Sequence, residues 1–394
     1  MRLFIKEASF YTGFGPSRES VRAALQAQSA IRKIDHLQNA GLPFDIGAEI
    51  PHQNQESLPA PGKRAPYWVK ETVAPLLERV DRTKTALLLS VGGPGWDDQE
   101  YLRAVHGQPS PPLEPAGEIE NSVFRNSGLS GPLITCHSAC AASTQLFSEA
   151  EDLLRAGEAQ ECILGGYDGR LHPLGIIGYY RLQALATMTS NPLVACRPFD
   201  QGRTGFVPGE GSAAFLMSSS EHFSPDASTL AEILGSASTC DAHRLTDPEI
   251  SGRSIARCMD TALLKAGVSP DQIDLIVSHG TGTPANDLAE TSAITRVFGN
   301  RLEQPPILAL KSMIGHCGMA SGVVELALTL ACLKEGMVPP ILNLEVPLNS
   351  EPLLNFVRET PLPLEGPQMI LKNSFGFGGQ NSCVILKSIP STFS

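Results

Sequence analysis

The chain has 394 residues, of which 42% are hydrophobic and 18% charged, and its formal net charge is −11 at pH 7. A chain of this length can hold two domains of ordinary size or one large two-part fold with a sizeable buried core. The acidic balance argues against general nucleic-acid binding, although a local basic patch could still meet an acidic partner.

The nine cysteines are scattered along the chain, without any Cys-x-x-Cys pair. An odd and dispersed set argues against a disulfide framework and favours reduced thiols. The first residues, MRLFIKEASF, carry no apolar run with a small-residue cleavage site. No stretch reaches the roughly 18 unbroken apolar residues of a membrane span. We therefore expect a cytoplasmic protein.

Strand-like and helix-like runs alternate along the chain, which predicts an α/β protein. Four runs predict strands: TALLLS (85–90), ECILGG (161–166), LIVSHG (275–280) and PILALKS (306–312). The run GPLITC leads into a predicted helix over 141–156 that ends at Gly157, and 318–333 predicts a buried helix because it is apolar nearly all round. The proline-containing region 97–125 is typical of a loop.

Two segments, 205–217 and 374–386, resemble each other, since both place a glycine loop before a hydrophobic strand. The polar stretch 218–228 lies between them. We expect two related halves, residues 1–225 with a candidate nucleophile and residues 226–394 with candidate histidines and a glycine loop.

Cys140 lies where a predicted strand turns into a helix, within ITCHSACAAST. Amide dipoles at a helix N-terminus favour an anion, so the thiol is expected to lose its proton more readily. Cys140 is a candidate nucleophile, and a buried structural cysteine is the alternative. A metal site with Cys136 and His137 is not supported, because 137 and 140 point to opposite faces of a strand and zinc needs about four ligands. Cys136 is interpreted as core, and His137 as an interface or pocket-edge residue.

His279 ends a predicted strand, where open α/β sheets bind their ligands. A buried histidine with all its hydrogen bonds satisfied is the alternative. Thr281 and Thr283 follow it and are either donors to an amide-bearing ligand or ordinary turn residues.

A third stretch, KSMIGHCGMASGVVE, contains Lys311, His316 and Glu325. The lysine and glutamate suggest a buried ion pair that orients the histidine; a surface lysine and a helix-start glutamate are the alternative. The glycine-rich NSFGFGGQNS (373–382) would let backbone amides approach a ligand and stabilise an oxyanion, or it is a turn between two strands.

Taken in order, these stretches resemble the β-ketoacyl-acyl carrier protein synthase family of the thiolase superfamily, in its elongating Cys-His-His branch. The matching motifs are the cysteine, HGTGTP, K-x-x-x-GH and NSFGFGG, with 139 residues from Cys140 to His279, 32 to Lys311 and 5 to His316. Further matches are RPFDQGRTGFVPGEGSAAF (197–215), PLGIIGYYRLQALAT (173–187) and CDAHRLTDP (240–248), so the resemblance covers nearly the whole chain.

The resemblance implies a thiolase-type fold of two similar α/β halves in a layered αβαβα arrangement, and a decarboxylating Claisen condensation. Cys140 would accept the acyl group, and His279 and His316 would stabilise the enolate of malonyl-acyl carrier protein. The other implied roles are an orienting Lys311–Glu325 pair, an oxyanion hole at the amides of Cys140 and Phe377 with Phe377 as gate, and pantetheine contacts from Thr281, Thr283, Asp241 and Thr246. No metal and no cofactor beyond the phosphopantetheine arm of the carrier is implied.

The implied partners are the acidic acyl carrier protein and a second subunit, either a copy of this chain or a related ketosynthase or chain-length factor. Lys63 and Arg64 precede a stretch that resembles the family's docking helix, and Arg197 opens the RPFD stretch. We expect these three residues to dock the carrier; ordinary solvated charges are the alternative.

Departures from the family leave the acyl chain and the pathway open between fatty acid, polyketide and polyene synthesis. Gln380 stands in place of the usual threonine, His137 in place of a small residue, and the stretch between Gly93 and Gly131 is short. A degradative thiolase would need a second catalytic cysteine, for which Cys383 is poorly placed. A non-catalytic partner subunit would lose the nucleophile, whereas Cys140 is intact.

Overall fold

The computed structural model describes residues 1–52, 58–92, 103, 106–108, 117–299, 304–348 and 354–389. Within them, one eleven-stranded sheet runs in the order β11-β10-β14-β15-β9-β1-β8-β7-β5-β6, with β2 paired to β1. Its strands are β1 (Leu3–Thr12), β2 (Gly15–Pro16), β5 (Thr85–Val91), β6 (Leu133–Thr135), β7 (Glu161–Asp168), β8 (Gly211–Ser219), β9 (Ala231–Cys240), β10 (Leu275–Val277), β11 (Ile307–Leu308), β14 (Met369–Gly376) and β15 (Gln380–Ser388).

The remaining described elements are short strands and helices. The short strands form two pairs: β3 (Arg32–Lys33) with β4 (Ile46–Gly47), and β12 (Met337–Val338) with β13 (Leu362–Pro363). The helices are α1 (Ser17–Leu25), α2 (Asp35–Asn39), α3 (Ala65–Leu77), α5 (Glu118–Ser127), α6 (Ala142–Ala156), α7 (Pro173–Arg181), α8 (Arg253–Ala266), α9 (Pro284–Phe298), α10 (Lys311–Ile314) and α11 (Ser321–Lys334).

The sheet has two flanks that repeat one strand order. Reading outwards from the centre, the first flank is β1-β8-β7-β5-β6 and the second is β9-β15-β14-β10-β11. In both, the outer strands pair in parallel and the inner ones antiparallel. The flanks join where β1 pairs with β9 at Leu3–Ile5.

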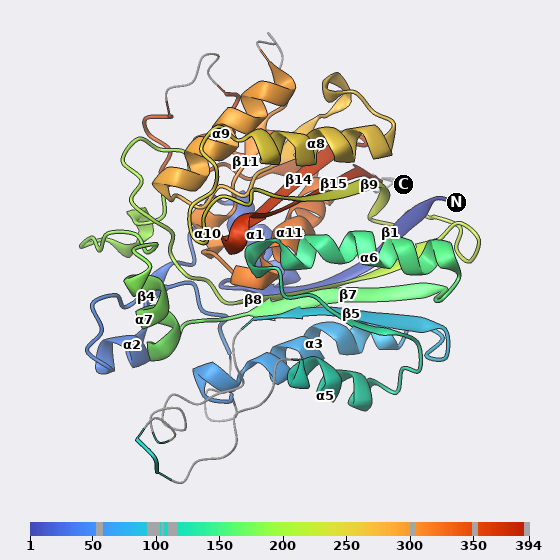
Figure 1. Ribbon diagram of the computed structural model, residues 1–394, viewed down its shortest axis with the longest axis horizontal. Coiled ribbons are helices and arrows are strands. Elements are labelled where there is room, and N and C mark those ends of the chain that lie inside the picture. Colours follow the sequence, from blue (N-terminus) through green and yellow to red (C-terminus); the bar gives the residue numbers. More distant parts are fainter. Residues whose placement is uncertain are drawn as a thin grey trace.

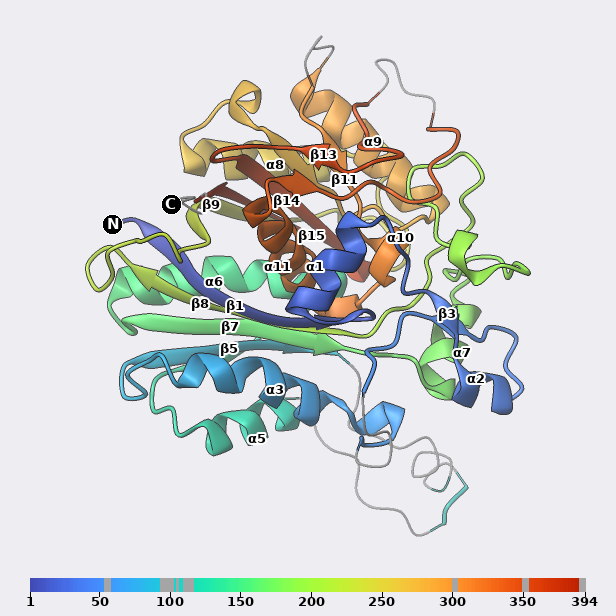
Figure 2. The same ribbon diagram turned by 180° about the vertical axis from the view of Figure 1, so that it is seen from behind.

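Five layers result, visible from both sides of the molecule (Figures 1 and 2). Helices α3 and α5 cover the outer face of the first flank, and α8 and α9 cover that of the second. Helices α6 and α11 lie between the flanks, where α6 contacts β5 and β7 on one side and β9 and β15 on the other. This arrangement confirms the expected αβαβα fold; the joining of both flanks into one hydrogen-bonded sheet was not expected.

The sequence of α11 explains its central position. An apolar helix without a polar face is stable only where it is covered on all sides. All of 321–330 in α11 is buried. Gly322 permits the close approach to α6, because a Cβ there would lie 2.1 Å from the Thr144 hydroxyl oxygen. The predicted buried helix is therefore confirmed, with its first three residues in a 3-10 turn, η6 (Gly318–Ala320).

Two local predictions were wrong. The region 97–125 was expected to be a loop, but 118–127 forms helix α5, whose buried residues Ile119 and Val123 pack in the outer-face core; residues 97–102 and 109–116 lie outside the described part. The strand expected over 306–312 ends at Leu308, and the chain turns into α10 at Lys311. The run 306–312 was predicted as one strand because a buried strand and a buried turn are both hydrophobic throughout, so the sequence pattern does not distinguish them.

Candidate active site

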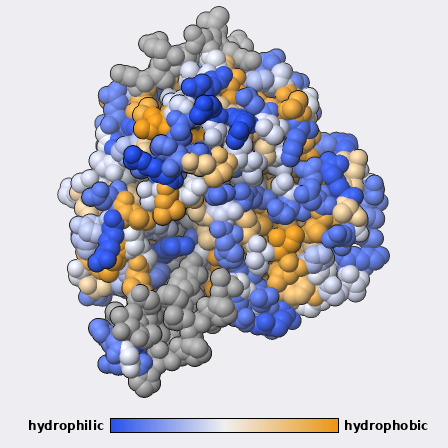
Figure 3. All heavy atoms as spheres, in the orientation of Figure 1, coloured by the Kyte–Doolittle hydropathy of each residue, from blue (hydrophilic) through white to orange (hydrophobic). Residues whose placement is uncertain are grey.

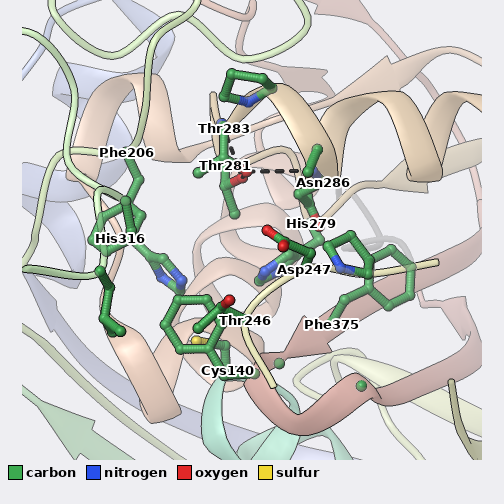
Figure 4. Close-up of a pocket in the computed structure, with 18 of the residues that line it drawn as sticks. Cys140, Phe206, Thr246, Asp247, His279, Thr281, Thr283, Asn286, His316 and Phe375 are labelled. Atoms are coloured by element: carbon green, nitrogen blue, oxygen red, sulfur yellow. Dashed lines mark hydrogen bonds between the residues drawn. The ribbon is translucent and has the colours of Figure 1, made fainter. Parts of the chain in front are cut away.

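The four stretches singled out in the sequence meet at one end of the sheet. Cys140 follows β6, His279 follows β10, His316 follows β11 and α10, and the glycine loop joins β14 to β15. Together with neighbouring loops they line a cavity of about 270 Å³. Figure 4 shows the imidazoles of His279 and His316 and the sulfur of Cys140 facing the same space, with Thr281 and Thr283 farther from the sulfur.

Cys140 lies in a 3-10 turn, η3 (Ala139–Ala141), directly before α6. Ala139 has φ 48°, a left-handed conformation that a residue with a side chain adopts at a cost, and it turns the chain sharply into the helix. Cys140 is half-buried and lines the cavity. The tight turn therefore presents the thiol to the cavity rather than to the core.

The expectation that the helix N-terminus makes this thiol acidic was wrong. Burial raises the pKa of Cys140 to about 11, and the Asp168 carboxylate adds to the rise, while Lys311 and Arg170 oppose it. The effect of burial therefore outweighs the stabilisation of a thiolate that the start of α6 was expected to give. At neutral pH the resting thiol keeps its proton, so any reaction of the sulfur must also account for that proton.

His279 is held by its backbone and by one ring nitrogen. Its amide, and that of Gly280, donate to the two carboxylate oxygens of Glu290 at 2.8 Å each. The Lys311 ammonium donates to the His279 carbonyl at 2.5 Å and lies 3.4 Å from Nδ1. Because an ammonium only donates, Nδ1 accepts and the ring proton is on Nε2.

His316 is oriented by different partners. Its Nδ1 lies 2.8 Å from the Ser321 hydroxyl, and its ring packs edge-on against Phe206 with centroids 5.1 Å apart. The rings of His279 and His316 are 5.4 Å apart at 82°. Burial, followed by the charges of Lys311 and Lys372, holds the pKa of both imidazoles well below the usual histidine range. Both rings are neutral at pH 7.

Behind the histidines, three fully buried charged groups meet. Lys311 and Lys372 each place Nζ 2.5 Å from a different oxygen of Glu325. Lys311 and Glu325 thus form the ion pair expected from the sequence. Lys372 was missed, although a lysine inside the apolar run MILKNSF, where a buried strand is expected, was the available signal.

The glycine loop packs directly on η3, the turn that carries Cys140. It contains the 3-10 turn η7 (Phe377–Gly379), in which Gly378 has φ 82° and Gly379 φ 75°. Gly376, just before it, has no room for a side chain, because a Cβ there would lie 2.9 Å from both the Cys140 nitrogen and the Ser138 oxygen. The backbone leading into Phe377 therefore lies against the Cys140 amide, and Phe377 lines the cavity.

We expect Gly376→Ala to separate the glycine loop from the turn that carries Cys140 and to reduce acyl transfer by about tenfold or more. Because φ at Gly376 is −126°, backbone strain does not oppose an alanine there. The methyl group is opposed by its contact with the backbone of Ser138 and Cys140. Single-turnover acylation of Cys140 measures the effect. The matched control is Gly178→Ala, where a Cβ meets nothing within 4 Å. Wild-type acylation in Gly376→Ala would contradict the close packing.

The predicted pantetheine residues all line the cavity, but their surroundings differ. The Thr281 and Thr283 hydroxyl oxygens are 2.9 Å apart, and Thr283 caps α9. Both carboxylate oxygens of Asp241 are occupied, one by the Asn381 amide at 2.7 Å and one by the Glu249 nitrogen at 2.9 Å. Asp241 therefore holds its loop in place, and Thr246 is presented by that loop.

Arg64 and Arg197, two of the expected docking residues, form ion pairs within the chain. Arg64 is buried, with NH1 2.6 Å from Glu49 and 3.4 Å from Glu210, so its assignment to a docking surface was wrong. Arg197 lies 3.2 Å from Asp200 and 3.3 Å from Glu345. Lys63 is half-buried in the turn before α3.

We expect Arg64→Ala to lower the free energy of unfolding by about 3–5 kcal/mol, because it leaves the buried carboxylate of Glu210 without its cation, whereas Glu49 keeps Arg32 at 3.2 Å. Chemical denaturation followed by circular dichroism measures this. Lys63→Ala, one residue earlier and half-buried, is the control and is expected to change stability by less than about 1 kcal/mol. Equal stabilities of the two variants would contradict a structural role for Arg64.

Three further residues singled out in the sequence are His137, Cys136 and Gln380. His137 is exposed and its Nε2 is 3.3 Å from Oε1 of the buried Glu120. Cys136, expected in the core, is half-buried, with its thiol 3.3 Å from the Gln145 side chain. Gln380 lies at the start of β15 with its amide 3.9 Å from the exposed Cys240 thiol. All nine cysteines are free thiols.

Comparison with known proteins decides the family. The description "Beta-ketoacyl synthase, N-terminal domain" matches residues 78–222, and "Beta-ketoacyl synthase, C-terminal domain" matches residues 230–345. The chloroplastic 3-oxoacyl-[acyl-carrier-protein] synthase II of Arabidopsis thaliana is 32% identical over 386 residues, which cover 92% of this chain and 71% of that protein. The chain belongs to the β-ketoacyl synthase family.

Other members of the family show how far the likeness extends. The chloroplastic 3-oxoacyl-[acyl-carrier-protein] synthase I of Hordeum vulgare is 39% identical over 260 residues, which are 66% of this chain and 55% of that protein. The chain thus spans about half the length of that relative. A β-ketoacyl synthase from Burkholderia phymatum superposes with a TM-score of 0.86 at 25% identity, covering 98% of this chain and 99% of that one.

Two solved assemblies share the fold at lower identity. One is a type II polyketide ketosynthase in complex with its acyl carrier protein, with a TM-score of 0.85, 24% identity, and coverage of 98% of this chain and 99% of that one. The other is a ketosynthase in complex with its chain length factor from Xenorhabdus doucetiae, with a TM-score of 0.78, 24% identity and 98% coverage of both chains.

The described residues contain neither a metal-binding cluster nor a membrane-spanning helix. Among them, no three His, Cys, Asp or Glu side chains are grouped so that they could hold a metal ion. In the same ranges, no helix combines the length and apolar character that crossing a membrane requires.

Proposed function

We propose that the chain is a β-ketoacyl-acyl carrier protein synthase, which joins an acyl group held on Cys140 to the two-carbon unit of malonyl-acyl carrier protein with loss of carbon dioxide. The observation that carries this proposal is the pair of neutral imidazoles, His279 and His316, around the same cavity as Cys140. Carbon–carbon bond formation needs an enolate, and neutral N–H donors stabilise it without delivering a proton to its carbon.

In the first half-reaction, the Cys140 sulfur attacks the carbonyl carbon of an acyl thioester, and the bond from that carbon to the carrier sulfur breaks. The thiol proton, which the raised pKa of Cys140 retains at neutral pH, moves to the leaving carrier sulfur as the new carbon–sulfur bond forms. The amides of Cys140 and Phe377, which the packing of Gly376 keeps close, stabilise the oxyanion.

In the second half-reaction, the bond to the malonyl carboxylate breaks and its electron pair forms the thioester enolate. When the Ser321 hydroxyl donates to Nδ1 of His316, the ring proton of neutral His316 is on Nε2. The Nε2–H groups of His279 and His316 then donate to the enolate oxygen. The enolate carbon attacks the acyl carbonyl, the carbon–sulfur bond to Cys140 breaks, and the thiolate takes a proton from water. One acyl group, one malonyl unit and one proton give one 3-oxoacyl thioester and one carbon dioxide.

Three groups of residues support this chemistry without reacting. The Lys311–Glu325 pair fixes the tautomer of His279 through the 3.4 Å contact to Nδ1. Thr281 and Thr283 present hydroxyl groups on the side of the cavity away from the sulfur, where the amides of a pantetheine arm would pass. Asp241 and Thr246 also line the cavity.

We assign the docking of acyl carrier protein to the mouth of this cavity. Leu182 and Leu245, which line the cavity, are 46% and 75% exposed, and Figure 3 shows hydrophobic patches among hydrophilic residues on the face seen in Figure 1. Lys63 remains a candidate docking charge. The KM of Lys63→Glu for carrier-bound substrate, against that for a small pantetheine thioester, measures its part in docking.

The second subunit is proposed to pair along β6, the last strand of the first flank. Residues 131–140 around it are all at least partly exposed, whereas most of the sheet is buried. An open sheet edge offers unpaired amides and carbonyls to another strand. Native mass spectrometry, alone and with a related ketosynthase, distinguishes a homodimer from a heterodimer; a monomer under both conditions would argue against pairing.

The division into halves 1–225 and 226–394 is part of the proposal and is supported by the repeated strand order of the two flanks. A reducing cytoplasm is proposed as the compartment, supported by nine free thiols. Release of carbon dioxide from malonyl-acyl carrier protein by the purified chain is the direct test of function. A chain with no such activity alone or with a second subunit would instead be a non-catalytic partner.

A further inference from the structure

Lys372 is a buried cation beside the site that the condensation mechanism above does not use. It lies in β14 with no exposed surface, and its Nζ contacts three oxygens. Glu325 Oε2 is at 2.5 Å, the Asn373 carbonyl oxygen at 2.8 Å and the Ser278 carbonyl oxygen at 3.4 Å. Ser278 directly precedes His279, so the ammonium reaches the strand end that carries the histidine.

Burying an ammonium group costs free energy, and the carboxylate of Glu325 already has Lys311 as its cation. A second lysine on the same carboxylate gives this three-residue cluster a net positive charge. The other buried carboxylate nearby, Glu290, is bonded to the amides of His279 and Gly280 and to the Asn373 side chain. An apolar side chain in β14 would avoid this cost, which points to a role for the charge itself.

We propose that Lys372 is a positioning residue of the condensing site, which holds Glu325 and the Ser278 carbonyl in place and adds a positive charge behind His279. This role rests on the proposed function and adds a residue to it. Lys372 acts through its neighbours and does not itself line the cavity.

The charges around the two imidazoles support this assignment. The charges of Lys311, His316 and Lys372 lower the pKa of His279, whose amide donates to Glu290, and those of Lys311, Lys372 and Arg170 lower the pKa of His316. Each of these cations disfavours a proton on the rings, and burial lowers the pKa of both histidines further. At the cavity mouth, Asp247 lies 3.5 Å from Arg244, which offsets its charge.

The test is the pH dependence of decarboxylation of malonyl-acyl carrier protein by Lys372→Met, Lys372→Arg and wild type. Removing the cation takes away one of the charges that lower the histidine pKa values, so these values should rise, while burial and Lys311 still hold them below the usual range. We expect the ratio of rates at pH 5.5 and pH 8 to fall by about twofold or more in Lys372→Met and to be restored in Lys372→Arg. Lys387→Met, the same change on an exposed position of β15, is the control.

A purely structural lysine would lower the rate equally at all pH values, and an unshifted profile in Lys372→Met would overturn the proposal. Should that variant not fold, Lys372→Gln, which keeps a donor and loses the charge, carries the same expectation. Histidine ring titration by NMR needs no activity, so it separates this proposal from the proposed function. His279 and His316 signals that titrate at the same pH in wild type and Lys372→Met would overturn it even in a chain that releases no carbon dioxide.

Discussion

Cys140→Ala is expected to remove the acyl adduct completely when the protein is incubated with an acyl-carrier thioester, and to lower condensation by more than about 1,000-fold. Among the described cavity-lining residues Cys140 is the one thiol, and the turn at Ala139 directs it there. Intact-protein mass spectrometry detects the adduct. The histidines are untouched, so the variant should still release carbon dioxide from malonyl-acyl carrier protein.

Cys136→Ala is the matched control, because Cys136 is half-buried four residues earlier and its thiol contacts Gln145 instead of the cavity. It should be acylated like the wild type. An adduct that persists in Cys140→Ala, or disappears in Cys136→Ala, would move the nucleophile to another position.

His279→Ala and His316→Ala should each reduce decarboxylation by about 100- to 1,000-fold, the loss typical of removing one donor to a developing oxyanion. Acylation of Cys140 should largely remain, because the enolate forms only in the second half-reaction. Release of labelled carbon dioxide and the mass of the acyl adduct measure the two steps separately. His222→Ala, an exposed histidine in the turn after β8, is the control.

The pH dependence adds a second check on the same residues. Burial and the two lysines lower the pKa of both imidazoles, so the neutral rings should persist below the ordinary histidine pKa of about 6.5. Wild-type decarboxylation should accordingly stay near its maximum at pH 6 and fall only at lower pH. Wild-type carbon dioxide release in both histidine variants, or a fall in the wild type centred at pH 6.5, would contradict neutral histidines as the enolate donors.

Much of this site could be predicted because its motifs bring strand ends together. Cys140, His279 and His316 each follow a strand, and in a sheet of this type the ends of parallel strands meet at one edge. The glycine loop was predictable for a related reason, since positive φ at Gly378 and Gly379 and the tight contact at Gly376 admit little else.

The errors came from contacts between residues distant in sequence. Arg64 looks like a surface charge beside Lys63, but Glu49 and Glu210, 15 and 146 residues away, bury it. The acidity of Cys140 was judged from the helix alone, whereas burial and Asp168 decide its pKa. Charge and burial of this kind depend on the finished fold, and local pattern does not encode them.

The central claim is that acyl-Cys140 reacts with a malonyl unit to form a carbon–carbon bond. Its most direct test is a single turnover: acylated protein, freed of excess substrate, is mixed with malonyl-acyl carrier protein, and both proteins are weighed by mass spectrometry. We predict that the acyl mass leaves Cys140 and appears on the carrier as a 3-oxoacyl group, with one carbon dioxide released per product. Loss of the acyl group to water, or carbon dioxide release that leaves acyl-Cys140 intact, would contradict the account.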